Sequence, residues 1–235
     1  MLPKKYKSTI VKITNPLPDI FSVTFTANKK FQYLPGQFLH LALDDFDGTS
    51  QWPESRCFSM QSSPNEETLK ITYAVKGNFT KRMSQELHEG NEVWLKFPYG
   101  DLFTQSHSKV NTVFIAGGTG ITPFLSLFTY ESFNEYINPK IYLGFRTKEY
   151  NIYDDELQRL SEIRKNSCNS FTSSKFVKLF YQETEGIIDI KSIYNENSIN
   201  SDYFISGPPA MIKTFKNYLI NNGLPEQKVK TDEWE

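Results

Sequence analysis

Cysteine and histidine are scarce in this sequence of 235 residues. The two cysteines, Cys57 and Cys168, have no metal-type spacing, and the three histidines form no His-x-x-x-His pair. These shortages exclude a disulfide framework and a cysteine-ligated iron–sulfur cluster, and they leave a haem or zinc site with little support. We therefore expect no metal centre.

Long apolar runs and an excess of charge of one sign are missing too. No run of about 18 apolar residues occurs, and the start, MLPKKYKSTIVKI, has neither an apolar core segment nor a small-residue cleavage site. The formal net charge is −1, with no block of lysines or arginines. We expect a cytoplasmic protein with no membrane span and no nucleic-acid partner.

Short strand-like runs fill the sequence up to about residue 105. Turn clusters such as NPLPD and SSPNEE separate the runs STIVKIT, IFSVTFTA, GQFLHLAL, RCFSM, LKITYAV and NEVWLKF. Runs of this kind at close spacing predict a small antiparallel β-barrel. One helix interrupts them, from Thr80, which can cap its first turn, to Gly90, which can close its last.

After residue 110, apolar strands alternate with helical segments. The strands TVFIA, KIYLGF, FVKLFY and DYFIS are followed by helical spacing at residues 124–133, 154–165, 189–194 and 209–222. This alternation predicts an α/β domain with a parallel sheet and with ligands at the carboxyl ends of its strands. The polar tract LFTQSHSKVN separates the two rhythms, so we place the domains at residues 1–105 and 106–235.

A turn rich in glycine follows the first of these later strands. It reads GGTGITP, a G-x-G-x-x-P variant of the dinucleotide-binding fingerprint, in which proline suits the first turn of the next helix. Its bare backbone, its amides and its hydroxyls can hold a pyrophosphate at the helix start, although a plain tight turn explains the same residues. The candidate binding residues are Gly117, Gly118, Thr119, Gly120, Thr122 and Pro123.

Two motifs in the first half also suit a phosphorylated, planar ligand. In ESRCFSM, Arg56 can pair with a phosphate, Phe58 can contact a flat heterocycle, and Ser59 can bond to a ring atom, whereas an edge strand with a surface arginine is the plainer reading. In VKGNFTKRM, Gly77 permits a left-handed turn and Thr80 begins a helix whose amides attract anions, although an ordinary capped helix is more common.

The order of these motifs resembles the ferredoxin–NADP reductase superfamily, in which a flavin-binding barrel precedes a nicotinamide-dinucleotide domain. The flavin motif Arg-x-Tyr-Ser is similar to Arg56-Cys57-Phe58-Ser59, with phenylalanine in place of tyrosine. The resemblance implies that Arg56 binds the flavin diphosphate, that Phe58 stacks on the flavin and that Ser59 lies near its N5 as a catalytic residue. Gly77 and Thr80 then hold the diphosphate, which implies FAD.

The second half carries three further points of resemblance. YLGFRTKEYNIYDDEL is similar to the segment that contacts the adenosine side of the coenzyme, which implies a role for Arg146. FISGPPAM resembles Cys-Gly-Pro-x-x-Met, so Ser206 is implied near the nicotinamide C4 as a catalytic residue, with Gly207 and Pro208 beside it. Trp234, in the acidic tail, either covers the flavin or nicotinamide, is a buried structural residue, or belongs to a disordered end.

The resemblance implies hydride transfer from NADH or NADPH to FAD, and then electron transfer to a separate redox protein such as ferredoxin, flavodoxin or an oxygenase component. Tyr181-Gln182-Glu183 stands where NADPH-using relatives carry Ser-Arg, which favours NADH, while Arg146 and Lys148 favour NADPH. A reductase of free flavin, iron chelates or quinones is one alternative. A low-turnover regulatory subunit that binds flavin and NAD is another.

Overall fold

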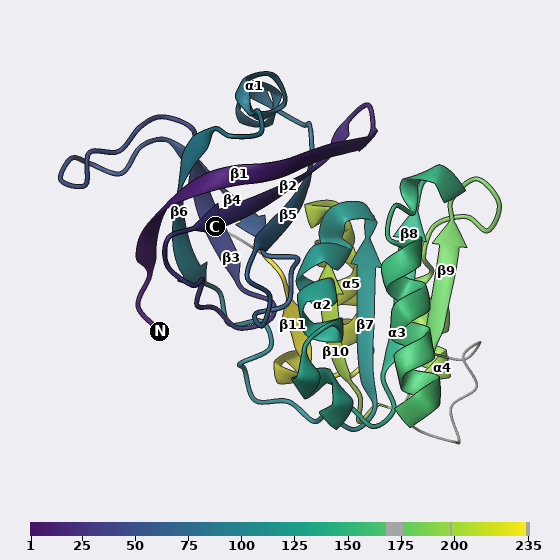
Figure 1. Cartoon of the computed structure of the whole chain (residues 1–235). Helices are drawn as coiled ribbons and strands as arrows, with labels where there is room; N and C mark the ends of the chain where they lie inside the picture. The colour runs from purple at the N-terminus through teal and green to yellow at the C-terminus, as the bar shows by residue number, and fades with distance from the viewer. Residues whose placement is uncertain (168–175, 198, 234–235) are drawn as a thin grey trace. The chain divides into compact units, whose positions relative to one another are not determined.

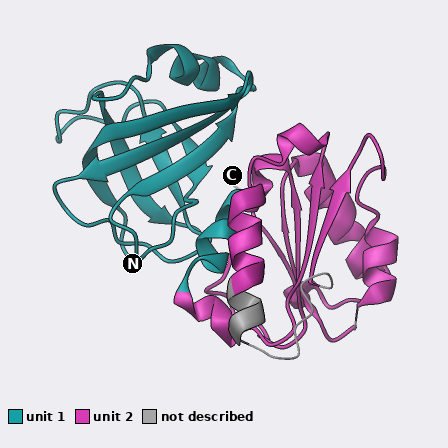
Figure 2. Cartoon of the chain, turned by 45° about the vertical axis from the view of Figure 1, so that its right-hand side comes forward, with its two compact units in different colours: residues 1–101, 122–130 teal, residues 102–121, 131–235 magenta. Residues whose placement is uncertain are grey.

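The computed structural model describes residues 1–167, 176–197 and 199–233 (Figure 1). The chain forms two compact units, coloured separately in Figure 2: unit 1 comprises residues 1–101 and 122–130, and unit 2 comprises residues 102–121 and 131–235. Each unit has its own hydrophobic core. Among the described residues, none of the helices is long and apolar enough to cross a membrane.

Unit 1 is a six-stranded antiparallel sheet with the order β4-β3-β6-β1-β2-β5. Just beyond β4, the backbone N–H of Gln61 donates to the carbonyl oxygen of Lys70 in β5 at 2.8 Å, so the two outermost strands nearly close a barrel. The predicted antiparallel barrel is confirmed. Its elements are β1 (Lys4–Leu17), β2 (Ile20–Ala27), β3 (Phe38–Ala42), β4 (Ser55–Ser59), β5 (Leu69–Ala74), α1 (Asn78–Glu86), β6 (Glu92–Tyr99) and α2 (Thr122–Phe128).

Strand β6 illustrates how the sequence forms the barrel. Val93, Leu95 and Phe97 are buried, while Trp94 and Lys96 between them are half-exposed. Side chains alternate across a strand, so this two-residue period gives the sheet one face for the core and one for solvent. Each buried side chain of this size contributes about 1.5–3 kcal/mol through removal from water.

Helix α1 differs from its prediction at both ends. It begins at Asn78, with Gly77 as the residue before its first turn, so Thr80 is an inner residue of that turn and not the cap. The Thr80 hydroxyl instead accepts from the backbone N–H groups of Lys76 and Gly77. At the other end, the N–H of Leu87 donates to Met83, and Leu87 is already extended, so the helix stops before Gly90.

Unit 2 contains a five-stranded parallel sheet with the order β11-β10-β7-β8-β9, which confirms the predicted parallel α/β domain. Figure 1 shows α3 and α5 on opposite faces of this sheet. The elements are β7 (Thr112–Gly117), η1 (Gly118–Ile121), η2 (Glu131–Glu135), β8 (Lys140–Phe145), η3 (Lys148–Tyr150), α3 (Asp154–Ser167), β9 (Val177–Tyr181), α4 (Ile190–Glu196), β10 (Asp202–Ser206), α5 (Pro209–Asn221), η5 (Glu226–Lys228) and β11 (Val229–Thr231).

The segment predicted as a helix over residues 124–133 is shorter than expected. A 3₁₀ helix, η1, follows β7, and α2 then begins at Thr122 with Pro123 as its second residue. After Phe128 the Thr129 hydroxyl donates to the carbonyl of Leu125, and the chain tightens into the separate 3₁₀ helix η2. Polar residues that bond to nearby backbone compete with helix continuation, which explains the early end.

Candidate functional site

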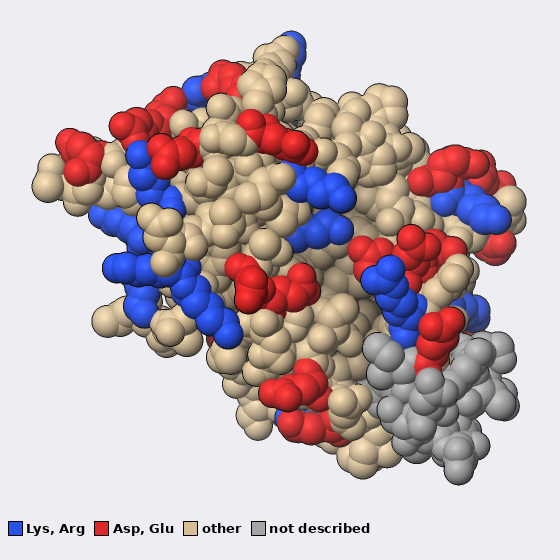
Figure 3. All heavy atoms as spheres, viewed as in Figure 1, with Lys and Arg blue, Asp and Glu red and all other residues tan. Residues whose placement is uncertain are grey.

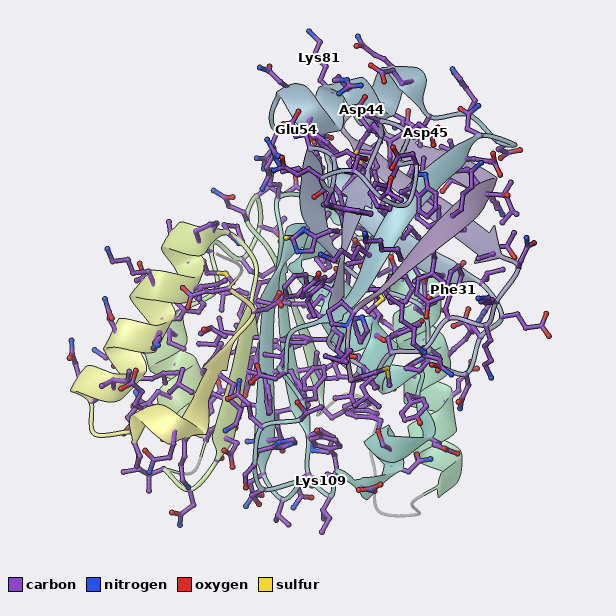
Figure 4. The ribbon with its side chains drawn as sticks, turned by 90° about the vertical axis from the view of Figure 1, so that its left-hand side faces the viewer. Phe31, Asp44, Asp45, Glu54, Lys81 and Lys109 are labelled. Carbon is purple, nitrogen blue, oxygen red and sulfur yellow. The ribbon has the colours of Figure 1, made fainter. Side chains whose placement is uncertain are left out.

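Arg56 lies beside the start of helix α1. It is exposed on β4, and its guanidinium lies 5.1 Å from the ring centroid of Phe79 in α1. It also donates to the carboxylate of Glu54 and to the carbonyl of Ser55, both at 2.8 Å. Figure 4 shows Glu54 and Lys81 at this end of the unit. An exposed ion pair contributes little, so the guanidinium can exchange Glu54 for a phosphate at small cost.

The first turn of α1 offers an anion site, but not through the backbone shape expected from the sequence. Gly77 has φ −157° and ψ −177°, an extended conformation open to any residue, so its predicted left-handed turn is wrong. A Cβ built on Gly77 would have no atom within 4 Å, so the space above this backbone is open. The first N–H groups of a helix lack intrahelical acceptors and favour negative charge.

Thr80 holds this helix start in shape. Its hydroxyl accepts from the N–H of Lys76 at 2.9 Å and from that of Gly77 at 3.2 Å, and it donates to the Gly77 carbonyl at 3.1 Å. These contacts engage the hydroxyl within the chain. A phosphate at this position would therefore be bound mainly by backbone N–H groups and Arg56.

Phe58 and Ser59 end strand β4 at the barrel core. Phe58 is 8% exposed and its ring lies 5.8 Å from that of Tyr73 at an interplanar angle of 59°. Ser59 is 4% exposed. Cys57 points to the other side of the strand, where its sulfur lies 3.6 Å from Nε2 of His40, and burial raises the pKa of this thiol. The alternation therefore separates Phe58 and Arg56 from Cys57.

The glycine-rich turn after β7 packs against the loop after β10. A Cβ on Gly120 would lie 2.5 Å from the Cα of Gly207 and 2.7 Å from the carbonyl carbon of Ser206. A Cβ on Gly117 would lie 3.1 Å from atoms of Pro208 and Met211. Gly120 is thus required by a close backbone contact, which brings together two motifs that are almost ninety residues apart in the chain.

Gly118 is the glycine of this turn that faces open space. Its φ is +55°, in the left-handed region, and a Cβ there would have no atom within 4 Å. Thr119 follows it in η1 and is half-exposed, whereas Thr122 is 3% exposed and, with Pro123, groups with unit 1. Bare backbone in open space at the end of a parallel strand is a suitable cradle for a diphosphate.

The Ser206 hydroxyl is hydrogen-bonded to Asp232, which the sequence analysis did not single out. The hydroxyl donates to Oδ2 of Asp232 at 3.0 Å, and the N–H of Asp232 donates to the Ile205 carbonyl at 2.9 Å. Strand β11 places Asp232 here by pairing in parallel with β10. Strand β11 has only three residues, which is too short for its strand pattern to be recognised in the sequence. The position of Asp232 beside Ser206 was therefore not predicted. Trp234 lies outside the described residues.

Three residues considered for coenzyme selectivity meet at the ends of β8 and β9. The N–H of Glu183 donates to the Arg146 carbonyl at 3.3 Å, and a carboxylate oxygen of Glu183 accepts from the N–H of Lys148 at 3.3 Å. The Arg146 guanidinium lies 5.7 Å from the ring centroid of Tyr150. A cation with a half-exposed ring beside it and a carboxylate close by can contact an adenosine and its ribose.

The residues present fit both nucleotides. Unit 1 offers a guanidinium and an open helix start, and unit 2 offers an open glycine backbone. A family model described as "FAD-binding domain" matches residues 4–139, and one described as "Oxidoreductase NAD-binding domain" matches residues 114–217. The chain belongs to this FAD-binding domain family. The chain therefore has an FAD-binding and a nicotinamide-dinucleotide-binding domain.

Relatives of the chain include the reductase component of propane 2-monooxygenase from Mycolicibacterium smegmatis, 28% identical over 86% of this chain and 59% of that protein. The chain spans about three fifths of that relative's length. The gamma subunit of sulfhydrogenase 2 from Pyrococcus furiosus is 28% identical over 89% of this chain and 76% of its own. A ferredoxin NADP+ reductase from Neisseria gonorrhoeae with bound FAD and NADP has a similar fold, with a TM-score of 0.75 at 19% identity, covering 97% of this chain and 98% of that one.

Proposed function

We propose that this chain passes a hydride from NADH or NADPH to bound FAD and then electrons to a separate acceptor. The observation that carries the proposal is the presence, in one chain matched by FAD- and NAD-binding models, of Arg56 beside an open helix start and of an open glycine backbone after β7. Bound FAD supplies the ability to accept a hydride and release electrons singly or in pairs. The protein supplies binding and orientation.

We assign residues 1–105 to FAD. Arg56 and the backbone at the start of α1 bind the diphosphate, and Thr80 holds that backbone in place. Phe58 supports one face of the flavin ring, and Ser59 hydrogen-bonds near its N5. Gly77 leaves the space that the diphosphate needs, since nothing lies within 4 Å of its Cβ position.

We assign residues 106–235 to the nicotinamide coenzyme. In the loop of residues 117–123, the backbone of Gly118 and the hydroxyls of Thr119 and Thr122 contact the pyrophosphate. Gly120 allows the close packing of this loop against Gly207. Ser206, whose hydroxyl is held by Asp232, orients the nicotinamide, with Pro208 beside it.

Within this proposal, NADH is the preferred coenzyme. The exposed Glu183 carboxylate would repel a 2′-phosphate and can accept a hydrogen bond from a ribose hydroxyl. Arg146 lies beside Glu183, to which it is joined by a backbone hydrogen bond, and its guanidinium can contact the adenosine side of either coenzyme. We expect Glu183→Ser to raise the ratio of kcat/KM for NADPH to that for NADH by about tenfold, equivalent to about 1.4 kcal/mol. An unchanged ratio would contradict the assignment of Glu183.

The acceptor we propose is a separate redox protein, either a ferredoxin, a flavodoxin or an oxygenase component. Support comes from the relative named as a reductase component of a monooxygenase. Reduction of free flavin, iron chelates or quinones is the alternative acceptor chemistry. A role as an electron-transfer or regulatory subunit of a larger complex is a second candidate, favoured by a sulfhydrogenase subunit of which this chain covers 76%.

The decisive experiment is to purify the protein, measure its flavin, and mix it with each coenzyme in a stopped-flow spectrophotometer. We expect a yellow protein that is bleached faster by NADH than by NADPH and reoxidised by an added acceptor. Arg56→Ala should lose FAD, while Arg82→Ala, which removes an arginine from α1 that is paired with Asp44 and Glu86, should retain it. A colourless protein that FAD cannot reconstitute would refute the proposal, and bleaching by neither coenzyme would favour the regulatory subunit.

A further inference from the structure

The outer face of the barrel carries a row of side chains that the FAD site does not use. Register places Cys57 of β4 opposite His40 of β3, His40 opposite Lys96 of β6, and Lys96 opposite Lys5 of β1. Directly paired residues on antiparallel strands point to the same face. With the aromatic residues beside it, this row forms what we name the lysine–aromatic face. Its members are Lys5, His40, Trp52, Lys96 and Tyr99.

The two lysines of this face are direct neighbours across two strands. Lys5 and Lys96 are directly opposite each other in the β1–β6 pair, an arrangement of like charges that destabilises a sheet. Among the residues that the structure describes, neither ammonium group has a carboxylate within 4.0 Å, whereas Lys7, two residues along β1, pairs with Glu92 at 2.8 Å. A repulsive pair that the fold itself does not need indicates a role in binding negative charge.

Aromatic rings hold both ammonium groups at the surface. The nitrogen of Lys5 lies 4.0 Å from the ring centroid of Phe46 and 6.0 Å from that of Trp52. The nitrogen of Lys96 lies 5.7 Å from Trp52 and 5.8 Å from Tyr99, so both cations share one indole. Trp52 is itself fixed by a hydrogen bond from Nε1 to the Ser55 hydroxyl at 3.0 Å, and it remains half-exposed.

Three acids in the segment between β3 and β4 are engaged by other groups. Asp44 pairs with Arg82 at 2.9 Å, Glu54 pairs with Arg56 at 2.8 Å, and Asp45 accepts from Nε1 of Trp94 at 3.1 Å. In Figure 3, lysine and arginine atoms gather on the left of unit 1, beside the N-terminal part of β1, below a group of acidic atoms. The face is therefore locally positive although the chain as a whole has a net charge of −1.

We propose that the lysine–aromatic face docks an acidic surface of the protein that accepts electrons from this chain. Tryptophan and tyrosine, here half-exposed, are enriched at protein interfaces, and opposite charge speeds encounter and fixes orientation. The proposal rests on the proposed function and extends it. On β4, Cys57, which pairs with His40 of the face, points away from Arg56 and Phe58, so an acceptor docked here is separated from these two assigned flavin residues by one thickness of sheet.

The test compares two double charge reversals. Lys5→Glu/Lys96→Glu changes the face, and Lys12→Glu/Lys213→Glu makes the same charge change at two exposed lysines, one on another part of β1 and one on α5. The probe is an acidic [2Fe–2S] ferredoxin, reduced with whichever coenzyme the wild type oxidises. Menadione, a small uncharged acceptor, reports coenzyme oxidation without protein docking.

We expect Lys5→Glu/Lys96→Glu to lower kcat/KM for ferredoxin at least tenfold at low salt, to remove most of its salt dependence, and to leave menadione reduction unchanged. The control variant should keep more than half of the ferredoxin activity. Lys5→Gln/Lys96→Gln, which removes the repulsive pair, should fold at least as well as the wild type and lose part of the ferredoxin activity. Equal effects of the reversal at the face and of the control would overturn the proposal.

Three further outcomes would identify another binding partner for this face or show that the proposed function itself is wrong. Tighter binding of a fluorescent single-stranded oligonucleotide than of ferredoxin, or dimerisation that the face variant abolishes, would replace the acidic protein by another partner and overturn the proposal. If the wild type oxidises neither coenzyme, the proposed function fails. Docking is then judged by equilibrium binding of labelled ferredoxin, and equal affinity for the wild type and the face variant overturns it.

Discussion

Gly120 has no space for a side chain. A Cβ at this position would lie 2.5–2.7 Å from backbone atoms of Ser206 and Gly207, which a change of side-chain rotamer cannot relieve. We expect Gly120→Ala to lower the free energy of unfolding by about 1–3 kcal/mol through overpacking. Gly77→Ala is the control, because Gly77 is extended and open, so the FAD-free protein should lose only about 0.5 kcal/mol, the small preference for glycine over alanine before a helix. Chemical denaturation measures both, and equal effects would contradict this account.

A buried ion pair joins β11 to β10 in unit 2. Nζ of Lys230 lies 2.9 Å from Oδ1 of Asp202, and their side chains are 2% and 7% exposed. We expect Lys230→Met to destabilise the protein by about 3–5 kcal/mol, because it leaves a buried carboxylate without its cation. Lys178→Met removes the exposed pair with Glu196 and should cost about 1 kcal/mol or less. Similar losses in the two variants would show that burial of the pair does not matter.

Among the elements, α1 depends on the hydroxyl of Thr80. Thr80→Val keeps the shape of the side chain but removes the three hydrogen bonds to Lys76 and Gly77. We expect a loss of about 1 kcal/mol of stability, as for other helix starts, together with weaker FAD binding. Ser84→Ala on the same helix removes only a bond to the Lys81 carbonyl and should leave FAD affinity unchanged. Titration of the apoprotein with FAD distinguishes the two variants.

Within unit 2, a histidine holds the segment of residues 102–111 against η2 and the residues that follow it. Nε2 of His107 lies 2.7 Å from the Tyr136 hydroxyl, and the two rings stack at 5.7 Å. Burial lowers the pKa of His107, opposed by the Gln105 carbonyl and assisted by the charge of Lys230. The folded state therefore favours the neutral ring, while the unfolded chain binds a proton below a pH of about 6.5.

A histidine whose pKa is lowered in the folded state stabilises the fold at pH values above its unfolded-state pKa, which is about 6.5. This stabilisation is lost as the pH falls through that pKa. We expect the thermal unfolding midpoint to fall between pH 8 and pH 5, and to fall less in His107→Gln. The difference between the two proteins isolates this residue from the other titrating groups. Parallel curves for the wild type and the variant would exclude His107 as a source of the pH dependence.

At the scale of the whole molecule, two separate cores predict that unfolding is not a single transition. FAD at about one hundred times its dissociation constant should stabilise the unit that binds it by about 2.7 kcal/mol. Differential scanning calorimetry with FAD should therefore move one transition, whereas Lys230→Met should move the other. One transition that shifts as a whole in both experiments would mean that the two units unfold together.

Much of this architecture could be predicted from local sequence patterns. A two-residue period of burial, as in β6, and apolar strands such as KIYLGF followed by helical spacing are properties of neighbouring residues. They were enough for the antiparallel barrel and the parallel sheet. The exact start of α1 was not predictable, because Gly77 and Thr80 both suit a helix cap and the choice depends on the hydrogen bonds that form.

Local sequence patterns were enough to predict the two sheet types and the order of the flavin and coenzyme motifs, and two cysteines are too few to hold an iron–sulfur cluster. The contact between Gly120 and Gly207, the hydrogen bond between Ser206 and Asp232, and the position of Lys5 opposite Lys96 became visible only in the folded chain. The physical reason is that strand register and loop contacts join residues far apart in the chain. No local period carries that information.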